Sequence, residues 1–297
     1  MHNFDTNFGI FLEICKKFSK NYAFKPRRGP VPKMSDLEVI ALALTAEYYQ
    51  INSENHLFYL LKNMSNKFVN LISRRQFNDR RKSLIYKIKQ IRQSIADLVN
   101  GDENIFIIDS KPIPVCKNAR FKRSKICKDS GFEKAPSTGY CSAQKMFYYG
   151  YKLHVVCGLS GMIHSFDFSK AKVHDVNYLR DVRYDYSDCT IIGDKGYISK
   201  TMQLNLFETA NINLEVPYRK NQHNYQPVNK PAAKARKRIE TLFSQLDDIF
   251  LTSKNYAKHA NGLFARIISK ISALTIVQYI NLIQGRPMNK IKNALFS

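Results

Sequence analysis

The sequence predicts an α/β protein with an all-α N-terminal region and C-terminal helices. In the first hundred residues, apolar side chains recur at the three- and four-residue spacing of helices. From residue 101 the patterns alternate in the order strand, hairpin, helix, strand, helix, strand, helix. The chain closes with an apolar tract, "ISALTIVQYINLI" at 271–283, that is typical of a buried helix. We therefore expect a helical region over 1–100 and an α/β domain with C-terminal helices over 101–297.

The N-terminal helices are marked by both periodicity and capping residues. The segment "FGIFLEICKKF" carries a helical apolar stripe. Ser35 and Glu38 form a capping-box pattern that predicts a helix through "DLEVIALALTAEYY", and Ser53 is placed to cap the next one. Residues 73–99 read as one long helix.

The 73–99 segment is strongly basic and predicts a DNA contact. It could be the recognition element of a helix-turn-helix, or a solvated basic face that covers a core. The basic side chains expected to meet phosphates or base edges are Arg74, Arg75, Arg80, Arg81 and Lys82.

In the second region, "NIFIID" at 104–109 predicts a strand that ends at Asp109. The basic stretch 110–147 contains prolines, glycines and little periodicity, so it predicts an insertion or long loop. Two strand patterns flank the turn at 158–161 and predict a hairpin. Further strands are expected around 189–194 and 212–219, and a long helix is expected to follow 217–234.

Composition indicates a polyanionic partner. The chain has 297 residues, 47 Lys and Arg against 24 Asp and Glu, a net charge of +23 and a pI near 9.7. Such an excess is typical of nucleic-acid binding, although an AT-rich genome also enriches lysine. Six cysteines without a CxxC pair predict reduced thiols, and the first residues lack a signal-peptide pattern. We expect a cytoplasmic, nucleoid-associated protein with no membrane partner.

Three carboxylates are the candidate catalytic residues. Asp109 and Asp194 each follow a predicted strand, and Glu240 flanks the apolar stripe of a later helix. Carboxylates without neighbouring histidine or thiolate suit hard cations such as Mg²⁺ or Mn²⁺. Two such ions can activate a nucleophile on one side of a phosphodiester and stabilise the leaving oxygen on the other. Each acid alone could equally be a turn, a cap or an exposed salt bridge.

The segments "IIDSKP", "GDKGY" and "RKRIETLFSQL" resemble the three acidic motifs of the DDE transposases of bacterial insertion sequences. The tract "PIPVC…GYCSA…FYYGYKLHVV" is similar to the insertion-sequence 982 group in particular. The resemblance implies a ribonuclease-H-like mixed-sheet domain in which Asp109, Asp194 and Glu240 bind two divalent ions. It implies cleavage at the terminal inverted repeats, strand transfer into target DNA, and a homodimer on DNA.

Other basic residues near the motifs are candidate DNA contacts: Lys195, Arg219, Lys220, Arg236 and Lys237. Tyr197 could stack on a base or pack in the core, and packing is favoured. Asp175 could belong to the site or cap the following helix, and the cap is favoured. Two rivals to a transposase remain open: a catalytically inactive or repurposed DNA-binding protein, and a structure-specific nuclease.

Overall fold

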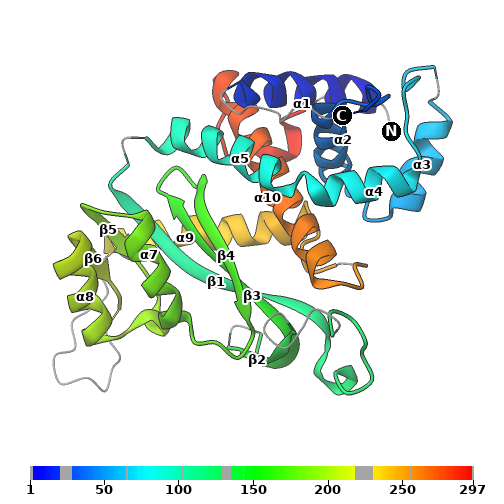
Figure 1. The fold of residues 1–297 in the computed structure, drawn as a ribbon. Helices are drawn as coiled ribbons and strands as arrows, with labels where there is room; N and C mark the ends of the chain where they lie inside the picture. The colour runs from blue at the N-terminus through cyan, green and yellow to red at the C-terminus, as the bar shows by residue number, and fades with distance from the viewer. Residues whose placement is uncertain are drawn as a thin grey trace. The chain divides into compact units, whose positions relative to one another are not determined.

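A computed structural model describes residues 3–20, 29–64, 66–101, 103–128, 135–142, 144–217, 230–254 and 256–295. The chain forms two compact units, one of residues 1–99 with 246–297 and one of residues 100–245. The mixed α/β architecture agrees with the predicted fold class (Figure 1). The division differs from the expected second domain 101–297, because the last long helix packs against helices of the N-terminal region.

The first unit is helical. Its described elements are α1 (Phe4–Ser19), α2 (Asp36–Tyr48), α3 (Glu54–Lys62), α4 (Arg74–Ser83), α5 (Ile85–Asn100), α10 (Ala260–Ile283) and the short η4 (Ile291–Asn293). The predicted capping box is present, since Ser35 and Glu38 each accept a backbone N–H of the other. The single helix expected over 73–99 is two helices, because the backbone turns at Leu84 and α5 starts afresh after it.

Helix α10 is long and apolar enough to cross a membrane, but 94% of its most apolar window is buried inside the protein. Burial of this kind is what a core helix requires. The helix packs against α2 and α4, so it is part of the core of the helical unit.

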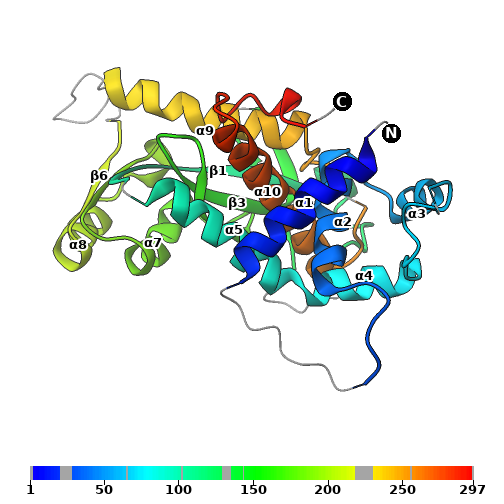
Figure 2. The same cartoon turned by 90° about the horizontal axis from the view of Figure 1, so that it is seen from above.

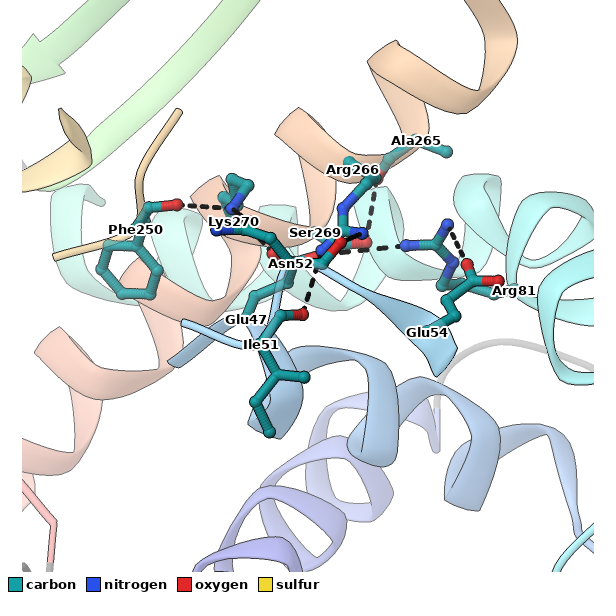
Figure 3. A network of polar contacts seen from close by, with 10 residues as sticks. All are labelled: Glu47, Ile51, Asn52, Glu54, Arg81, Phe250, Ala265, Arg266, Ser269 and Lys270. Carbon is teal, nitrogen blue, oxygen red and sulfur yellow. Dashed lines mark hydrogen bonds and ion pairs between the residues drawn. The ribbon is translucent and has the colours of Figure 1, made fainter. Parts of the chain in front are cut away.

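A buried charge network joins α2, α4 and α10 (Figure 3). The Glu47 carboxylate is 2% exposed and lies 2.9 Å from the Arg266 guanidinium and 2.8 Å from the Lys270 amine. Arg81 lies 3.8 Å from Glu47 and 2.8 Å from Glu54. Burial alone would raise the pKa of the Glu47 carboxyl, but Arg266, Lys270 and Arg81 outweigh it and hold the pKa below its usual value. The network therefore needs an ionised Glu47.

Glu47→Gln should destabilise the helical unit strongly. The substitution leaves cations buried without their shared counter-ion, and breaking a buried ion pair from one side costs about 3–5 kcal/mol. Chemical denaturation should show this as a lower unfolding midpoint. Glu13→Gln is the control, because Glu13 pairs with Lys16 at the surface, where an ion pair contributes little. Equal effects of the two substitutions would contradict the assigned role of Glu47.

The second unit is built on one mixed sheet. Its strands are β1 (Ile105–Lys117), β2 (Ser137–Cys141), β3 (Met146–Gly158), β4 (Ile163–Lys170), β5 (Cys189–Ile192) and β6 (Ile212–Glu215). The order is β2-β3-β1-β5-β6, and β4 also pairs with β3. β3 is antiparallel to β1, β2 and β4, whereas β1, β5 and β6 run parallel. The predicted hairpin around 158–161 is β3–β4.

The stretch 110–147 is not one loop, which corrects the expected insertion. β1 continues through Lys117 and pairs with β3 along its whole length. The strand tolerates Pro112 and Pro114 because β5 pairs only with Ile105–Ile107, which leaves one edge of β1 open beyond that point. Two prolines at alternate positions place their missing N–H groups on that same open edge. The prolines therefore mark an edge and not the end of the strand.

Helices cover both faces of this sheet. η2 (Asp175–Tyr178), α7 (Leu179–Asp185), η3 (Lys195–Tyr197) and α8 (Lys200–Ala210) lie on one side, and α9 (Lys230–Asp248) lies on the other (Figure 2). The core on the α7–α8 side joins side chains of β1, β5 and β6, such as Ile108, Ile191 and Leu214, to Leu179 and Leu206 of the helices. This packing fixes the strand ends that carry the candidate site.

Gly150→Ala should destabilise the sheet. A Cβ on Gly150 would lie 2.2 Å from the Ile113 carbonyl oxygen and 2.9 Å from the Val115 nitrogen, both backbone atoms. Backbone cannot move aside as a side-chain end can, so we expect a loss of more than about 2 kcal/mol, in the range of overpacked sites. Thermal unfolding provides the measurement. Gly9→Ala in α1 is the control, since nothing lies within 4 Å of its Cβ position, and it should be neutral or stabilising.

Candidate active site

Asp109 lies within β1, and Asp194 lies just past the end of the adjacent parallel strand β5. The last β1–β5 pair is Ile107 with Ile192, and each aspartate stands two residues beyond it. Side chains alternate along a strand, so Asp109 points to the same face of the sheet as Ile107. The charge of Asp194 acts on the Asp109 carboxyl, so the two carboxylates lie near each other. The strand pairing therefore brings together two of the three predicted acids.

The backbone around each aspartate orients its carboxylate. Asp109 Oδ1 accepts the Ser110 N–H at 2.7 Å. Asp194 precedes η3, and its Oδ1 accepts the Gly196 N–H at 2.7 Å. A Cβ on Gly196 would lie 2.9 Å from Asp194 Oδ1 and 3.2 Å from Asp175 Oδ2. Those two oxygens are thus close neighbours around the same point, and a side chain at position 196 would press on both.

Asp175 is a third acid at this site, and the favoured reading of it as a helix cap was wrong. The 3₁₀ turn that it opens has no side-chain cap. Instead, Asp175 Oδ1 accepts the Ser110 hydroxyl at 2.8 Å and the Lys152 amine at 3.0 Å. Lys152 also donates to the Val173 carbonyl at 2.8 Å. Asp175 therefore ties β1 and β3 to the segment that leads into α7.

The environment of Asp109 disfavours its charged form. The pKa of the Asp109 carboxyl is raised to about 7, chiefly by burial and also by the negative charges of Asp194 and Asp175, against the lowering effects of the Ser110 N–H and Arg236. A raised carboxyl pKa at a group of acids is typical of a functional site, where a bound cation would restore the charged form.

Two buried polar side chains adjoin the acids. Tyr197 is fully buried, as the packing alternative predicted, and its hydroxyl has no hydrogen-bond partner among the described residues. Burial, then Asp175, Asp109 and Asp194, raise the pKa of the Tyr197 phenol. His154 bonds Ser169 at 2.7 Å, and burial lowers its pKa to about 4. Both groups are held neutral beside the carboxylates.

Glu240 lies on α9 and is exposed. Arg236, one helical turn earlier, acts electrostatically on Asp109, so this part of α9 runs near the strand carboxylates. Among the residues that the structure describes, no three His, Cys, Asp or Glu side chains form a group that could hold a metal ion. The role of Glu240 in the trio therefore stays a prediction.

Some of the side chains predicted to contact DNA are exposed to solvent, and others are buried. Arg81 is 5% exposed and bound in the Glu47 network, which corrects its assignment as a DNA contact. Arg80 is tied to Asp36 at 2.7 Å and to the Met34 carbonyl. Arg219 and Lys220 lie outside the described residues. The exposed candidates are Arg74, Arg75, Lys82, Lys195 and Lys237, while Arg236 is half-buried.

Sequence reasoning missed Lys152 and Ser110. Lys152 stands among apolar residues in "GYKLHVV", and a lysine inside a buried strand pattern is itself a signal that a counter-ion lies nearby. Ser110 directly follows Asp109 but carries no such signal. Its partner is fixed only by the fold.

The comparison with known families identifies the family of the chain. A family model described as a transposase DDE domain matches residues 100–276. The chain belongs to this transposase family. No curated protein and no solved structure matches it. The match begins where the sheet unit begins and extends into α10.

Family membership supports the ribonuclease-H-like description of the mixed sheet. Transposases of this family generally use divalent metal ions and act on DNA. The donor type of the residues present suits such an ion, because Asp109, Asp175 and Asp194 carry hard oxygen atoms, although these side chains do not converge as a three-ligand group in the described structure. The unpartnered, buried Tyr197 hydroxyl beside them is a further polar group without a partner in the described chain.

Asp109→Asn should stabilise the metal-free transposase more at pH 8 than at pH 4. The pKa of Asp109 is raised in the fold, so its ionisation opposes folding increasingly as pH rises from about 4 to about 7. One pKa unit corresponds to about 1.4 kcal/mol, and we expect a difference on the order of 2–4 kcal/mol. Urea unfolding in chelator at both pH values measures it. The exposed Asp181→Asn is the control, and an equal pH effect there would contradict the prediction.

Proposed function

We propose that this chain is a DNA transposase that cleaves DNA at the terminal inverted repeats of its element and joins the freed ends to target DNA. The proposal names Asp109, Asp194 and Glu240 as the residues that hold two Mg²⁺ or Mn²⁺ ions. Its main support is the equivalent placement of Asp109 and Asp194 beyond the last β1–β5 pair, in a chain of the transposase family. When bound, the ions would activate the attacking water or 3′-hydroxyl and stabilise the leaving oxygen.

Glu240 enters the proposal through its helix. Side chains four residues apart share a helix face, so Glu240 stands on the same face as Arg236, whose charge acts on Asp109. The exposed position of Glu240 leaves it free to turn toward an ion. Arg236 offers a positive charge beside the acids before any ion binds.

The network around Asp175 has a supporting role in this proposal. Lys152 supplies a cation within the acidic group, and its ion pair to Asp175 is mostly shielded from water. Ser110 links Asp175 to the backbone next to Asp109. Together they hold the middle of β1 and the η2 segment in place while charge on the carboxylates changes. Lys195 is exposed directly after Asp194, and we propose that it contacts a phosphate.

The basic surface serves substrate binding. The exposed Arg74, Arg75 and Lys82 on α4 are proposed to contact the element ends. We also propose that two copies act together on DNA, since two ends have to be joined.

The decisive experiment incubates the full chain with labelled DNA carrying the element ends and either Mg²⁺ or Mn²⁺. Joined products support the transposase, cleavage alone supports a structure-specific nuclease, and a mobility shift alone supports a binding protein without catalysis. Asp109→Asn, Asp194→Asn and Glu240→Gln should each lower the cleavage rate by more than about a hundredfold, because even residues that only orient metal ligands cost about 10–100-fold.

Glu208→Gln, an exposed carboxylate on α8, is the matched control and should cleave like the unmodified chain. Mn²⁺ titration followed by electron paramagnetic resonance gives a readout independent of activity, and the same three substitutions should weaken Mn²⁺ binding. Unaltered cleavage in Glu240→Gln would remove that residue from the site.

A further inference from the structure

The far end of the β2–β3 ribbon carries an exposed aromatic pair. Tyr140 on β2 and Phe147 on β3 are directly opposite each other, and their ring centroids lie 4.9 Å apart. Tyr140 is 51% exposed and Phe147 is 58% exposed, and Met146 beside them is 39% exposed. Cross-strand partners share one face of a sheet, so the two rings form a single apolar surface open to solvent.

A basic segment borders this surface. Phe121 packs on Tyr149 with ring centroids 5.7 Å apart. Tyr149 stands two residues from Phe147 on the same face of β3. The packing of Phe121 therefore holds its own segment beside the aromatic pair. The exposed basic side chains of that segment are Lys117, Arg120, Lys122, Arg123, Lys125 and Lys128.

Within the described part of 110–147 there is no Asp or Glu. A cationic surface that also presents aromatic faces is the combination with which proteins hold single-stranded or unpaired nucleotides. The positive charges attract the phosphates, and the ring faces stack on bases. A protein partner with an acidic surface would use the charges but would have no need for two bare rings.

We propose that Tyr140 and Phe147 form a stacking platform for unpaired bases of the DNA that the transposase handles. This inference deepens the proposed function and rests on it only in taking DNA as the ligand. Along β1, eight residues separate Asp109 from Lys117, which pairs with Tyr148 of β3. At about 3.3 Å per residue this is about 26 Å, or roughly eight base pairs of duplex DNA. The platform thus meets DNA well away from the carboxylates.

The test compares binding of the full chain to three fluorescent 30-nucleotide probes in chelator: a duplex, the same duplex with four unpaired central bases, and a single strand. Tyr140→Leu/Phe147→Leu keeps the apolar character of the ribbon but removes both ring faces. It should bind the bubble and the single strand about tenfold more weakly, with little change on the duplex. 2-Aminopurine in the bubble should be quenched by the unmodified chain and not by this variant.

Phe207→Ala is the matched control, because Phe207 is 59% exposed on α8 of the same unit. It should leave all three affinities unchanged. Tyr140→Phe/Phe147→Tyr preserves the rings and should keep the quenching. Arg120→Gln/Arg123→Gln should flatten the salt dependence of binding, whereas the leucine variant should keep the unmodified slope.

Unchanged bubble affinity and quenching in the leucine variant would overturn the platform. A leucine variant that changes only its gel-filtration volume would also overturn the platform, because Tyr140 and Phe147 would then be a contact between copies of the chain. Because binding is measured without metal, a chain that fails to cleave still gives a clear result. Loss of stacking and loss of catalysis are therefore distinguishable.

Discussion

The parallel pairing of β1 with β5 is the constraint on which the candidate site depends. Three residue pairs set the register, and they place Asp109 and Asp194 at the same distance past the last pair. A slip of one residue would turn one carboxylate to the opposite face of the sheet. The apolar residues of the pairing, such as Ile107 and Ile191, are fully buried, so core packing opposes that slip. Burial of the apolar residues that pair β1 with β5 thus determines the positions of Asp109 and Asp194, two residues further along each segment.

Bringing acids together has an energetic cost that the surrounding residues moderate. The raised pKa of Asp109 reflects burial first and the neighbouring acids second. Lys152 offsets part of the repulsion by pairing with Asp175, and Arg236 contributes from α9. In the helical unit the buried groups are mainly cations, and the Glu47 carboxylate is the anion that several of them share. In each unit the carboxylate at the centre of the network, Glu47 or Asp175, is paired with a cation.

The sequence predicted the order of elements because apolar periodicity is a local property. It failed at 110–117, where Pro112 and Pro114 suggested a loop, because whether a strand edge is open depends on how far the neighbouring strand extends. It also failed for Arg81, since a basic helix face looks the same whether its arginines meet DNA or a buried glutamate. Asp109 and Asp194 were predictable because each follows an apolar strand pattern that is visible in sequence, although β1 continues past Asp109 to Lys117. The contacts of Asp175 with Ser110 and Lys152 join three distant segments, so they could not be predicted from the sequence.

The basic side chains of the protein divide into two kinds, those in buried ion pairs and those exposed to solvent. The first kind forms buried ion pairs inside the helical unit and consists of Arg81, Arg266 and Lys270. The described part of 117–128 contains exposed lysines and arginines and no acidic residue, so an external polyanion would relieve their mutual repulsion. Folding buries the paired cations, so they cannot contact DNA, and it leaves the basic side chains of 117–128 exposed. The total of 47 Lys and Arg therefore overstates the number of cations that can face DNA, and the location of each cation in the fold decides which of them can meet a phosphate.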